Sequence, residues 1–269
     1  GADDSTRIDL NNFVDQLSKN NYITQSIQLD LISFGFRVKK NYFSMSVIEK
    51  QQIGFRYPKD FFEFVAKGNG GLLDQDLNFN FGLNVTHYRE YGIGYARELM
   101  DEKLSVGIKA KYLYGMTNIW TEKSDITFRT GSAYFDYTLS SDIRVNTSVL
   151  PAVKLLYSPL GYATVLDPFA NFNAGDYLFG KKNNGLAVDL GAVYKLNDKF
   201  NFSASIVDLG YINWKSDVAN YVSAKPGAQF KFEGIDISKY ASSNTDSMSE
   251  KLQDSIATLF RINTTHENY

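Results

Sequence analysis

The chain has 269 residues, with 28 Lys and Arg against 30 Asp and Glu, and this near-neutral balance excludes the basic surface that nucleic-acid binding needs. It contains no cysteine, which excludes disulfides, thiolate nucleophiles and cysteine metal ligands. The length suits one large all-β domain or two ordinary ones, and the 20 Phe, 18 Tyr and 2 Trp residues favour strands and the aromatic belts of membrane interfaces.

The N-terminal part predicts a short helix followed by a long hairpin. Residues 8–20 carry one apolar stripe at helical spacing. A strand is expected over residues 22–38, and its apolar positions change parity at Leu31 and Ile32, which predicts a β-bulge. The chain then turns and returns as a second strand over residues 42–57.

The rest of the chain predicts a succession of strands. A short helix over residues 58–66 starts at Pro58 and ends before Gly68. Strands are then expected over residues 76–86, 90–98, 103–115, 125–139 and 143–150. After a long loop with some strand at 153–157, further elements are expected, namely strands over 185–196, 199–209 and 230–237 and a helix over 245–260. Tight turns between neighbouring strands indicate an antiparallel meander, which we assign to a single β-barrel-type domain over residues 1–269.

The stretch DLNFNFGLNV (residues 76–85) alternates large apolar side chains with Asn and Gly, so this strand has two different faces. In the four clearest strands, over residues 76–85, 104–114, 186–194 and 200–206, 11 of the 16 positions between the apolar ones are Asn, Gly, Ser or Ala. A soluble sheet normally has a charged outer face, whereas small polar residues fit the inside of a barrel. The pattern therefore favours a transmembrane β-barrel with its apolar face toward lipid.

Several segments resemble an outer-membrane β-barrel family of the Bacteroidetes that carries only a domain-of-unknown-function label. The matching segments are QLDLISFGFRVKKNYF (28–43), YPKDFFEF (57–64), THYREYGIGY (86–95), DYLFGKKNNG (176–185), IVDLGYINWK (206–215) and FEGIDI (232–237). The resemblance implies an exported barrel from which a signal peptide has been removed, and it supplies no catalytic residues. Family members continue with further strands after the helix expected at 245–260, so a chain that stops at Tyr269 looks like the N-terminal, larger part of such a protein.

The chemistry-bearing residues predict no catalytic, cofactor or metal site. His87 and His266 are the only histidines, and no metal-binding motif is present. A carboxylate calcium site at Asp74 and Asp76, or at Asp101 and Glu102, is an alternative to ordinary solvated turns. His87 could act in catalysis, but no G-x-S-x-G motif accompanies it, so we expect no enzyme.

Two sets of residues are candidates for functional positions in a membrane barrel, one in its lumen and one at the membrane interfaces. Lys109, Lys111 and Asp189 alternate onto the face of small residues and are candidates for lining the lumen, either as a salt-bridge network that plugs it or as a selectivity ring for anionic or zwitterionic solutes. Aromatic residues near strand ends are candidates for the membrane interfaces, or for a sugar-stacking platform. They are Tyr57, Tyr88, Tyr91, Tyr112, Tyr114, Trp120, Tyr194, Tyr211 and Trp214.

The sequence thus predicts a non-enzymatic barrel of the bacterial outer membrane, complete or incomplete. Its partner is the lipid bilayer, and its role is passive transport, surface assembly or scaffolding. The alternative is a soluble or periplasmic β-barrel or β-sandwich that binds a lipid or other apolar ligand inside. The directions of Phe79, Phe81, Leu186 and Val188 separate the two hypotheses, because outward side chains favour the membrane and inward ones the soluble protein.

Overall fold

The computed structural model describes residues 9–133, 136–149, 155–157, 163–165, 173–180, 182–232 and 256–269. Its helices are α1 (Leu10–Gln16), α2 (Lys59–Lys67) and α3 (Ala174–Phe179), with a 3₁₀ turn η1 (Asn69–Gly71). The strands are β1 (Asn20–Val38), β2 (Asn41–Pro58), β3 (Asp76–Asn78), β4 (Gly82–Leu99), β5 (Leu104–Thr130), β6 (Tyr137–Ser148), β7 (Leu155–Tyr157), β8 (Ala163–Val165), β9 (Asn183–Lys195), β10 (Asn201–Asn213), β11 (Val218–Ser223), β12 (Ala228–Phe232) and β13 (Ile262–Thr265).

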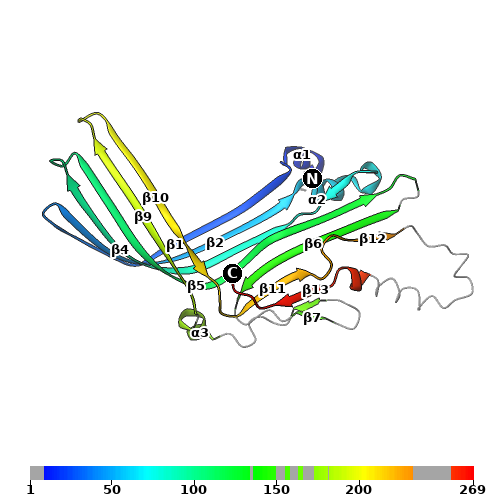
Figure 1. Cartoon of the computed structure of the whole chain (residues 1–269). Coiled ribbons are helices and arrows are strands. Elements are labelled where there is room, and N and C mark those ends of the chain that lie inside the picture. Colours follow the sequence, from blue (N-terminus) through cyan, green and yellow to red (C-terminus); the bar gives the residue numbers. More distant parts are fainter. Residues whose placement is uncertain are drawn as a thin grey trace, which may run out of the picture.

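Almost all strands belong to one antiparallel sheet that forks along β5 (Figure 1). The first half of β5 pairs with β9, and its second half pairs with β6. The sheet therefore has two arms that meet at a bend. The hairpin arm runs from the bend to the turns of β1–β2, β4–β5 and β9–β10, and the helix arm carries α1, α2, β3, β6 and β11 to β13.

Irregular pairings lie close to this bend. The register of β1 against β2 shifts between Asp30 and Ile32, which confirms the bulge predicted at Leu31. The register of β4 against β5 shifts between His87 and Tyr88, and that of β10 against β9 shifts between Ile206 and Leu209. Each extra residue increases the local twist and turns the strand, so the sheet bends where its strands are bulged.

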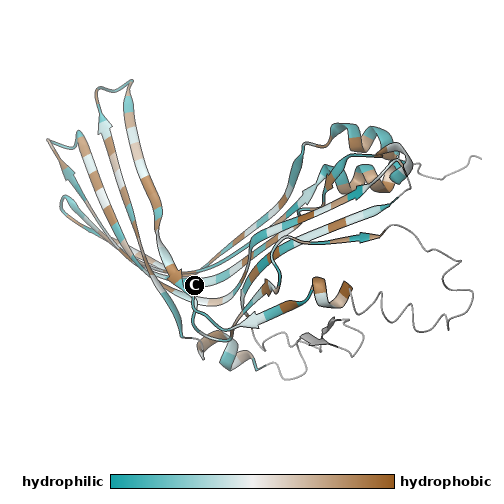
Figure 2. Cartoon of the chain, turned by 45° about the vertical axis from the view of Figure 1, so that its right-hand side comes forward, coloured by the Kyte–Doolittle hydropathy of each residue, from teal (hydrophilic) through white to brown (hydrophobic). Residues whose placement is uncertain are grey.

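Hydrophobic and hydrophilic residues alternate along the strands of the hairpin arm (Figure 2), so this arm has two chemically distinct faces. Three successive rows of residues cross β1, β2, β4, β5, β9 and β10 on one face, and all their members are apolar or aromatic. The rows are Ile32–Val47–Tyr91–Tyr112–Leu186–Tyr211, Phe34–Met45–Ile93–Ala110–Val188–Leu209 and Phe36–Phe43–Tyr95–Ile108–Leu190–Ile206. We call these three rows the apolar belt, and its side chains are well exposed, as in Ile93 at 71% and Leu186 at 59%.

The opposite face of the same strands is small and polar. Its rows include Ser33–Ser46–Gly92–Lys111–Ala187–Gly210 and Arg37–Tyr42–Ala96–Gly107–Gly191–Ser205. This face is concave, because Lys50 on β2 reaches Asp208 on β10 across the intervening strands, with 3.1 Å between Nζ and Oδ2. The apolar belt is therefore on the convex face.

In the helix arm, aromatic side chains pack beneath α2, whereas Ile23 and Ile27 of β1 stay exposed. The rings of Phe61 and Phe64 on α2 contact those of Phe79, Phe81 and Phe128 edge to face, at centroid distances between 5.0 and 5.8 Å. Helix α1 packs on α2 through Phe13 and Phe62. Pro58 precedes α2 and Gly68 closes it with a φ of +67°, as the sequence predicted.

The directions of the four test residues therefore divide between the arms. Phe79 and Phe81 pack into the aromatic layer under α2, whereas Leu186 and Val188 belong to the convex belt of the hairpin arm. By the criterion set from the sequence, the outward side chains of the hairpin arm favour the membrane hypothesis, whereas the packed ones of the helix arm favour the soluble hypothesis.

The antiparallel all-β fold is as predicted, although the element boundaries differ in two ways. The strand predicted over 76–86 is broken, because the Asn80 side chain accepts a hydrogen bond from the Ile126 backbone N–H (2.9 Å) and replaces the backbone pairing. Conversely, the strand predicted over 103–115 continues to Thr130 as one long strand, β5, with a bulge on each pairing edge. The strand predicted over 125–139 is divided between the end of β5 and the start of β6 at Tyr137. The sequence also missed α3, β11 and β13, which are short.

The sheet is not closed among the described residues, where β1 pairs only with β2 and β10 only with β9. No helix in the described part of the chain is long and apolar enough to cross a bilayer. Most of the helix expected at 245–260 lies outside the described residues, and residues 256–259 at its end are helical.

Candidate functional site

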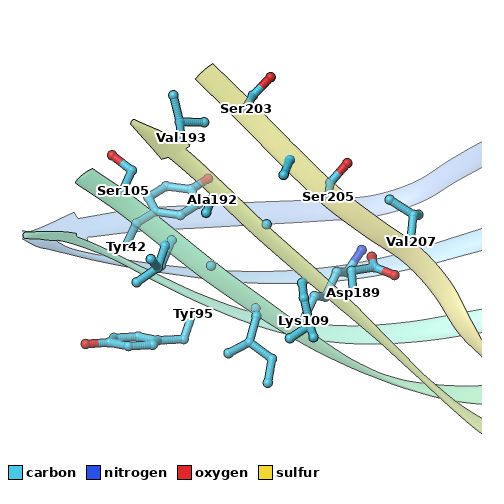
Figure 3. A pocket seen from close by; sticks show the side chains of 18 of the residues that line it. Tyr42, Tyr95, Ser105, Lys109, Asp189, Ala192, Val193, Ser203, Ser205 and Val207 are labelled. Carbon is cyan, nitrogen blue, oxygen red and sulfur yellow. The ribbon is translucent and has the colours of Figure 1, made fainter. Parts of the chain in front are cut away.

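The concave face of the hairpin arm encloses a hollow of about 580 Å³ (Figure 3). Serine hydroxyls line it from three strands, with Ser44 on β2, Ser105 on β5, and Ser203 and Ser205 on β10. Gly94, Gly107 and Gly191 leave backbone exposed between them, and Tyr42, Val193 and Val207 add larger side chains to the wall. Lys109 and Asp189 lie at the opposite end of the hollow from Ser105, nearer the bend.

Six ionised side chains form one network at this inner end. The charge cluster consists of Lys50 on β2, Glu90 on β4, Lys109 and Lys111 on β5, Asp189 on β9 and Asp208 on β10. It contains three lysines and three carboxylates, so its formal charge is zero. The cluster spans five strands and connects the two sides of the arc.

Glu90 is the centre of the cluster. Its carboxylate is fully buried at 0% exposure. The Nζ atom of Lys50 lies 2.9 Å from Oε2, and the Nζ atom of Lys109 lies 3.1 Å from Oε1. A buried carboxylate is tolerated only when cations compensate for its lost hydration, and two ammonium groups at hydrogen-bond distance provide this compensation.

Asp208 is held by an unusual backbone. It occupies the β10 bulge with a φ of +57°, a left-handed conformation that is uncommon for a residue with a side chain. Its N–H donates to the Asp189 carboxylate (2.8 Å), and its own carboxylate accepts a bond from Lys111 (2.6 Å). The bulge thereby directs Asp208 into the cluster instead of toward the convex side.

The structure brings the three lumen candidates together. Lys109 and Asp189 are register partners, and Lys111 Nζ lies 2.5 Å from Asp189 Oδ2. Sequence reasoning missed the three other members of the cluster, Lys50, Glu90 and Asp208. Alternation along β2 and β4 was the only sequence signal that could have placed Lys50 and Glu90 on the concave face. At Asp208 the bulge reverses the alternation along β10, so the same signal would have misplaced this residue. That these residues line a lumen stays a prediction.

The interfacial aromatic candidates do not all share one location. Tyr91, Tyr112 and Tyr211 form part of the belt row nearest the bend, and Tyr194 lies near the hairpin turns. Tyr114 borders the belt beside Arg89, whereas Trp120 and Tyr57 lie in the helix arm. Tyr88 and Trp214 are buried at 9% and 6% exposure. Tyr88 faces Lys50, its register partner on β2, and Trp214 packs against Gly115, so neither ring lies on the exposed convex surface. Placement of the exposed candidates at a membrane interface stays a prediction.

A second polar group lies on the convex face, just beyond the belt. Glu49 accepts bonds from Arg89 Nε (2.7 Å) and lies 2.8 Å from His87 Nε2. The other ring nitrogen of His87 contacts the Tyr177 hydroxyl of α3, and Phe179 of α3 lies over the Arg89 guanidinium at 5.7 Å. Burial raises the pKa of the Tyr177 phenol. We call these five residues the α3 clamp, because they attach α3 to the sheet.

The clamp and the acidic turns give no support to a catalytic or metal site. Glu49 orients His87 as a carboxylate orients a catalytic base, but the group on the other side of the ring is a phenol that holds α3. No cluster of metal-binding side chains occurs in the described residues. Asp74 and Asp76 both lie near Arg129, at 3.5 and 3.4 Å, and Asp101 lies 3.8 Å from Lys40, which favours ordinary ion-paired turns.

Comparison with known proteins gives a family without a function. A family model described as "Family of unknown function (DUF5723)" matches residues 1–269. No curated protein and no solved structure matches the chain. The geometry of the two faces is therefore the basis for any functional conclusion.

Proposed function

The chain belongs to the DUF5723 family of unknown function, and we propose that it is a non-enzymatic protein that inserts its hairpin arm into a bilayer through the apolar belt. The observation that carries the proposal is the composition of the three belt rows, which are apolar on all six strands and exposed. An exposed apolar surface of this extent is unfavourable in water, and lipid is the partner that would cover it on every strand.

Charged residues border the belt toward both ends. The next convex row toward the bend contains Glu49 and Arg89, and the next row toward the turns contains Asn41 and Arg97 beside the apolar Val106. Roughly eight residues separate Arg89 from Arg97, about 26 Å of strand at ~3.3 Å per residue. At the strand tilt of membrane barrels this is a vertical height of roughly 20 Å, slightly less than their apolar band of ~25 Å.

The soluble alternative places an apolar ligand inside the sheet. That arrangement needs large apolar side chains throughout the concave face, where this chain has Tyr42, Val193 and Val207 among serines, glycines and the charge cluster. The helix arm, whose aromatic layer is covered by α2, would lie outside the bilayer. The outer membrane is the bilayer that contains two-faced sheets of this kind, and the family resemblance of segments 28–43 and 86–95 supports the same location.

Lipid also constrains the sheet edges. Unpaired backbone groups in hydrocarbon cost several kcal/mol each, so the outer edges of β1 and β10 have to be paired within the bilayer. We therefore propose that the membrane form is a closed sheet. Passive passage, surface assembly and scaffolding are all roles that such a sheet can perform without catalysis.

Two neighbouring residues on opposite faces provide the test. Met45→Cys and Ser44→Cys introduce one thiol each into a chain without cysteine, on the belt and in the hollow respectively. In vesicles we expect a charged, membrane-impermeant thiol reagent to react with Ser44→Cys and to spare Met45→Cys. Equal or faster reaction of Met45→Cys, or a wild-type chain that stays monodisperse without detergent, would contradict membrane insertion.

A further inference from the structure

We propose that the hollow of the hairpin arm is a passage for small uncharged polar solutes and that the charge cluster is its constriction. This inference rests on the proposed membrane insertion and adds to it a transported class of solute. It is carried by three observations on the concave face, namely the lining of the hollow, the position of the cluster and the balance of its charges.

The lining places hydroxyl groups in a wall that is otherwise mostly apolar side chains and backbone, and among the described residues its only charged side chains are Lys109 and Asp189. Ser44, Ser105, Ser203 and Ser205 offer hydroxyl groups that both donate and accept hydrogen bonds. The glycines leave the space between them open, and a Cβ atom at Gly191 would have no neighbouring atom within 4 Å. A hydrated polyol can exchange hydrogen bonds with water for bonds to such a wall at little cost.

The cluster narrows the hollow at the bend. Lys50 and Asp208 belong to the second and sixth strands of the arc, and their side chains meet across it at 3.1 Å. Lys111 is buried at 4% exposure between Asp189 and Glu90. Lys109 and Asp189 both line the hollow and belong to the cluster, so in the closed sheet proposed above a solute that leaves the hollow toward the helix arm passes these side chains.

The balance of charges decides against an ion-selective ring. Lys109 and Lys111 alone would attract anions, as the sequence allowed. However, Glu90 and Asp208 contribute two carboxylates that the sequence did not place there, and each lysine ammonium lies within 3.1 Å of a carboxylate oxygen. Since the net charge is zero, a passing ion of either sign finds no uncompensated partner and would have to break an existing pair.

The permeation experiment uses the full chain in lipid vesicles. We expect vesicles that contain the protein to swell in isotonic arabinose several-fold faster than protein-free vesicles. Gly191→Trp should reduce this rate severalfold, because the ring fills the hollow and leaves every ion pair of the cluster in place. Gly191→Ala is the matched control and should permeate arabinose like the wild type.

The selectivity experiment uses variants of opposite charge in planar bilayers under a KCl gradient. Asp208→Asn leaves the cluster with an excess positive charge and should shift the reversal potential toward anion selectivity. Lys109→Gln leaves an excess negative charge and should shift it toward cations, while the wild type stays close to non-selective. Both side chains are partly exposed, so both variants should fold.

The outcomes separate this inference from membrane insertion. A chain that passes the thiol-labelling test but gives no arabinose swelling would overturn the passage and leave insertion intact. Swelling that Gly191→Trp does not change, or reversal potentials that ignore both charge variants, would show that solutes do not cross this hollow. A chain that fails the labelling test would overturn both proposals together.

Discussion

Glu90 is the most deeply buried carboxylate of the charge cluster and contacts its three lysines. Its side chain, on β4, contacts lysines from β2 and β5 while it is completely removed from solvent. Desolvation of these charges is costly, and only their mutual pairing offsets the cost. At the scale of single residues, the concave face is therefore sensitive to loss of one partner and tolerant of changes at its exposed edge.

This sensitivity predicts unequal effects of two carboxylate replacements. Glu90→Gln leaves Lys50 and Lys109 without their buried partner, and we expect a loss of about 3–5 kcal/mol in the free energy of unfolding. Asp208→Asn should cost only ~1 kcal/mol, because the Asp208 side chain is 45% exposed. Unfolding by urea in detergent micelles measures both. A Glu90→Gln variant as stable as Asp208→Asn would show that the cluster is not held together by Glu90.

Glycines on the concave face differ in what surrounds them. A Cβ atom at Gly115 would lie 2.6 Å from Cζ3 of Trp214, whereas one at Gly191 would meet nothing within 4 Å. Gly115→Ala should therefore displace the Trp214 ring and destabilise the protein by about 1–3 kcal/mol, with a change in tryptophan emission. Gly191→Ala should leave both stability and emission unchanged. Equal behaviour of the two variants would contradict the packing of Trp214 against β5.

At the scale of elements, α3 is attached to the sheet by a few polar contacts. Helix α3 has six residues and no buried residue, so its own packing contributes little. Tyr177 and Phe179 contact His87 and Arg89, and these two residues are in turn held by Glu49. The ordering of α3 therefore depends on the neutral phenol of Tyr177 and the ion pair beneath it.

This dependence predicts that α3 detaches at alkaline pH. Because burial raises the pKa of Tyr177 in the folded protein, its stabilising contribution is complete below the ordinary value of about 10 and is lost as the pH rises through the folded value. We expect the emission of a Phe179→Trp reporter to change above pH ~10. The same reporter combined with Tyr177→Phe should show no such step. A step that persists without the phenol would have to come from another group.

At the scale of the whole molecule, the two arms differ in how far their apolar convex faces are covered by other parts of the chain. Both have a face of large apolar residues on the convex side. The helix arm covers part of that face with the phenylalanines of α2 and leaves Ile23 and Ile27 of β1 exposed, whereas the hairpin arm leaves its whole belt without a covering helix. The bulges at the bend separate the two regions, and the Glu49–Arg89 pair marks the border of the belt.

The height of the belt predicts a preference for thin bilayers. The charged residues that border the belt lie about 26 Å apart along the strand, or roughly 20 Å apart along the membrane normal after tilt, which matches a hydrocarbon layer thinner than the ~30 Å average. We expect the thermal midpoint to be highest in short-chain phosphatidylcholine vesicles and to fall as chain length increases, because thicker bilayers cover the Glu49–Arg89 row. A midpoint that is independent of lipid chain length would argue against the belt as the membrane-spanning surface.

The sequence by itself determined the antiparallel all-β class, the bulge at Leu31, the helix after Pro58 and the two-faced character of the hairpin strands. These features depend on local periodicity and on backbone restrictions, which neighbouring residues in the chain specify directly. The same parity correctly placed Lys109, Lys111 and Asp189 on one face, since alternation within a strand needs no knowledge of its partners.

Only the tertiary structure decided which residues meet. Glu90 joins the cluster because the register places β4 between β2 and β5, and Asp208 joins it because a bulge reverses the parity of β10. The register also assigned Tyr88 and Trp214 to the interior and placed Phe79 under α2. Register, bulges and curvature depend on contacts between residues far apart in the chain, so an alternating pattern can define a face without defining what that face contacts.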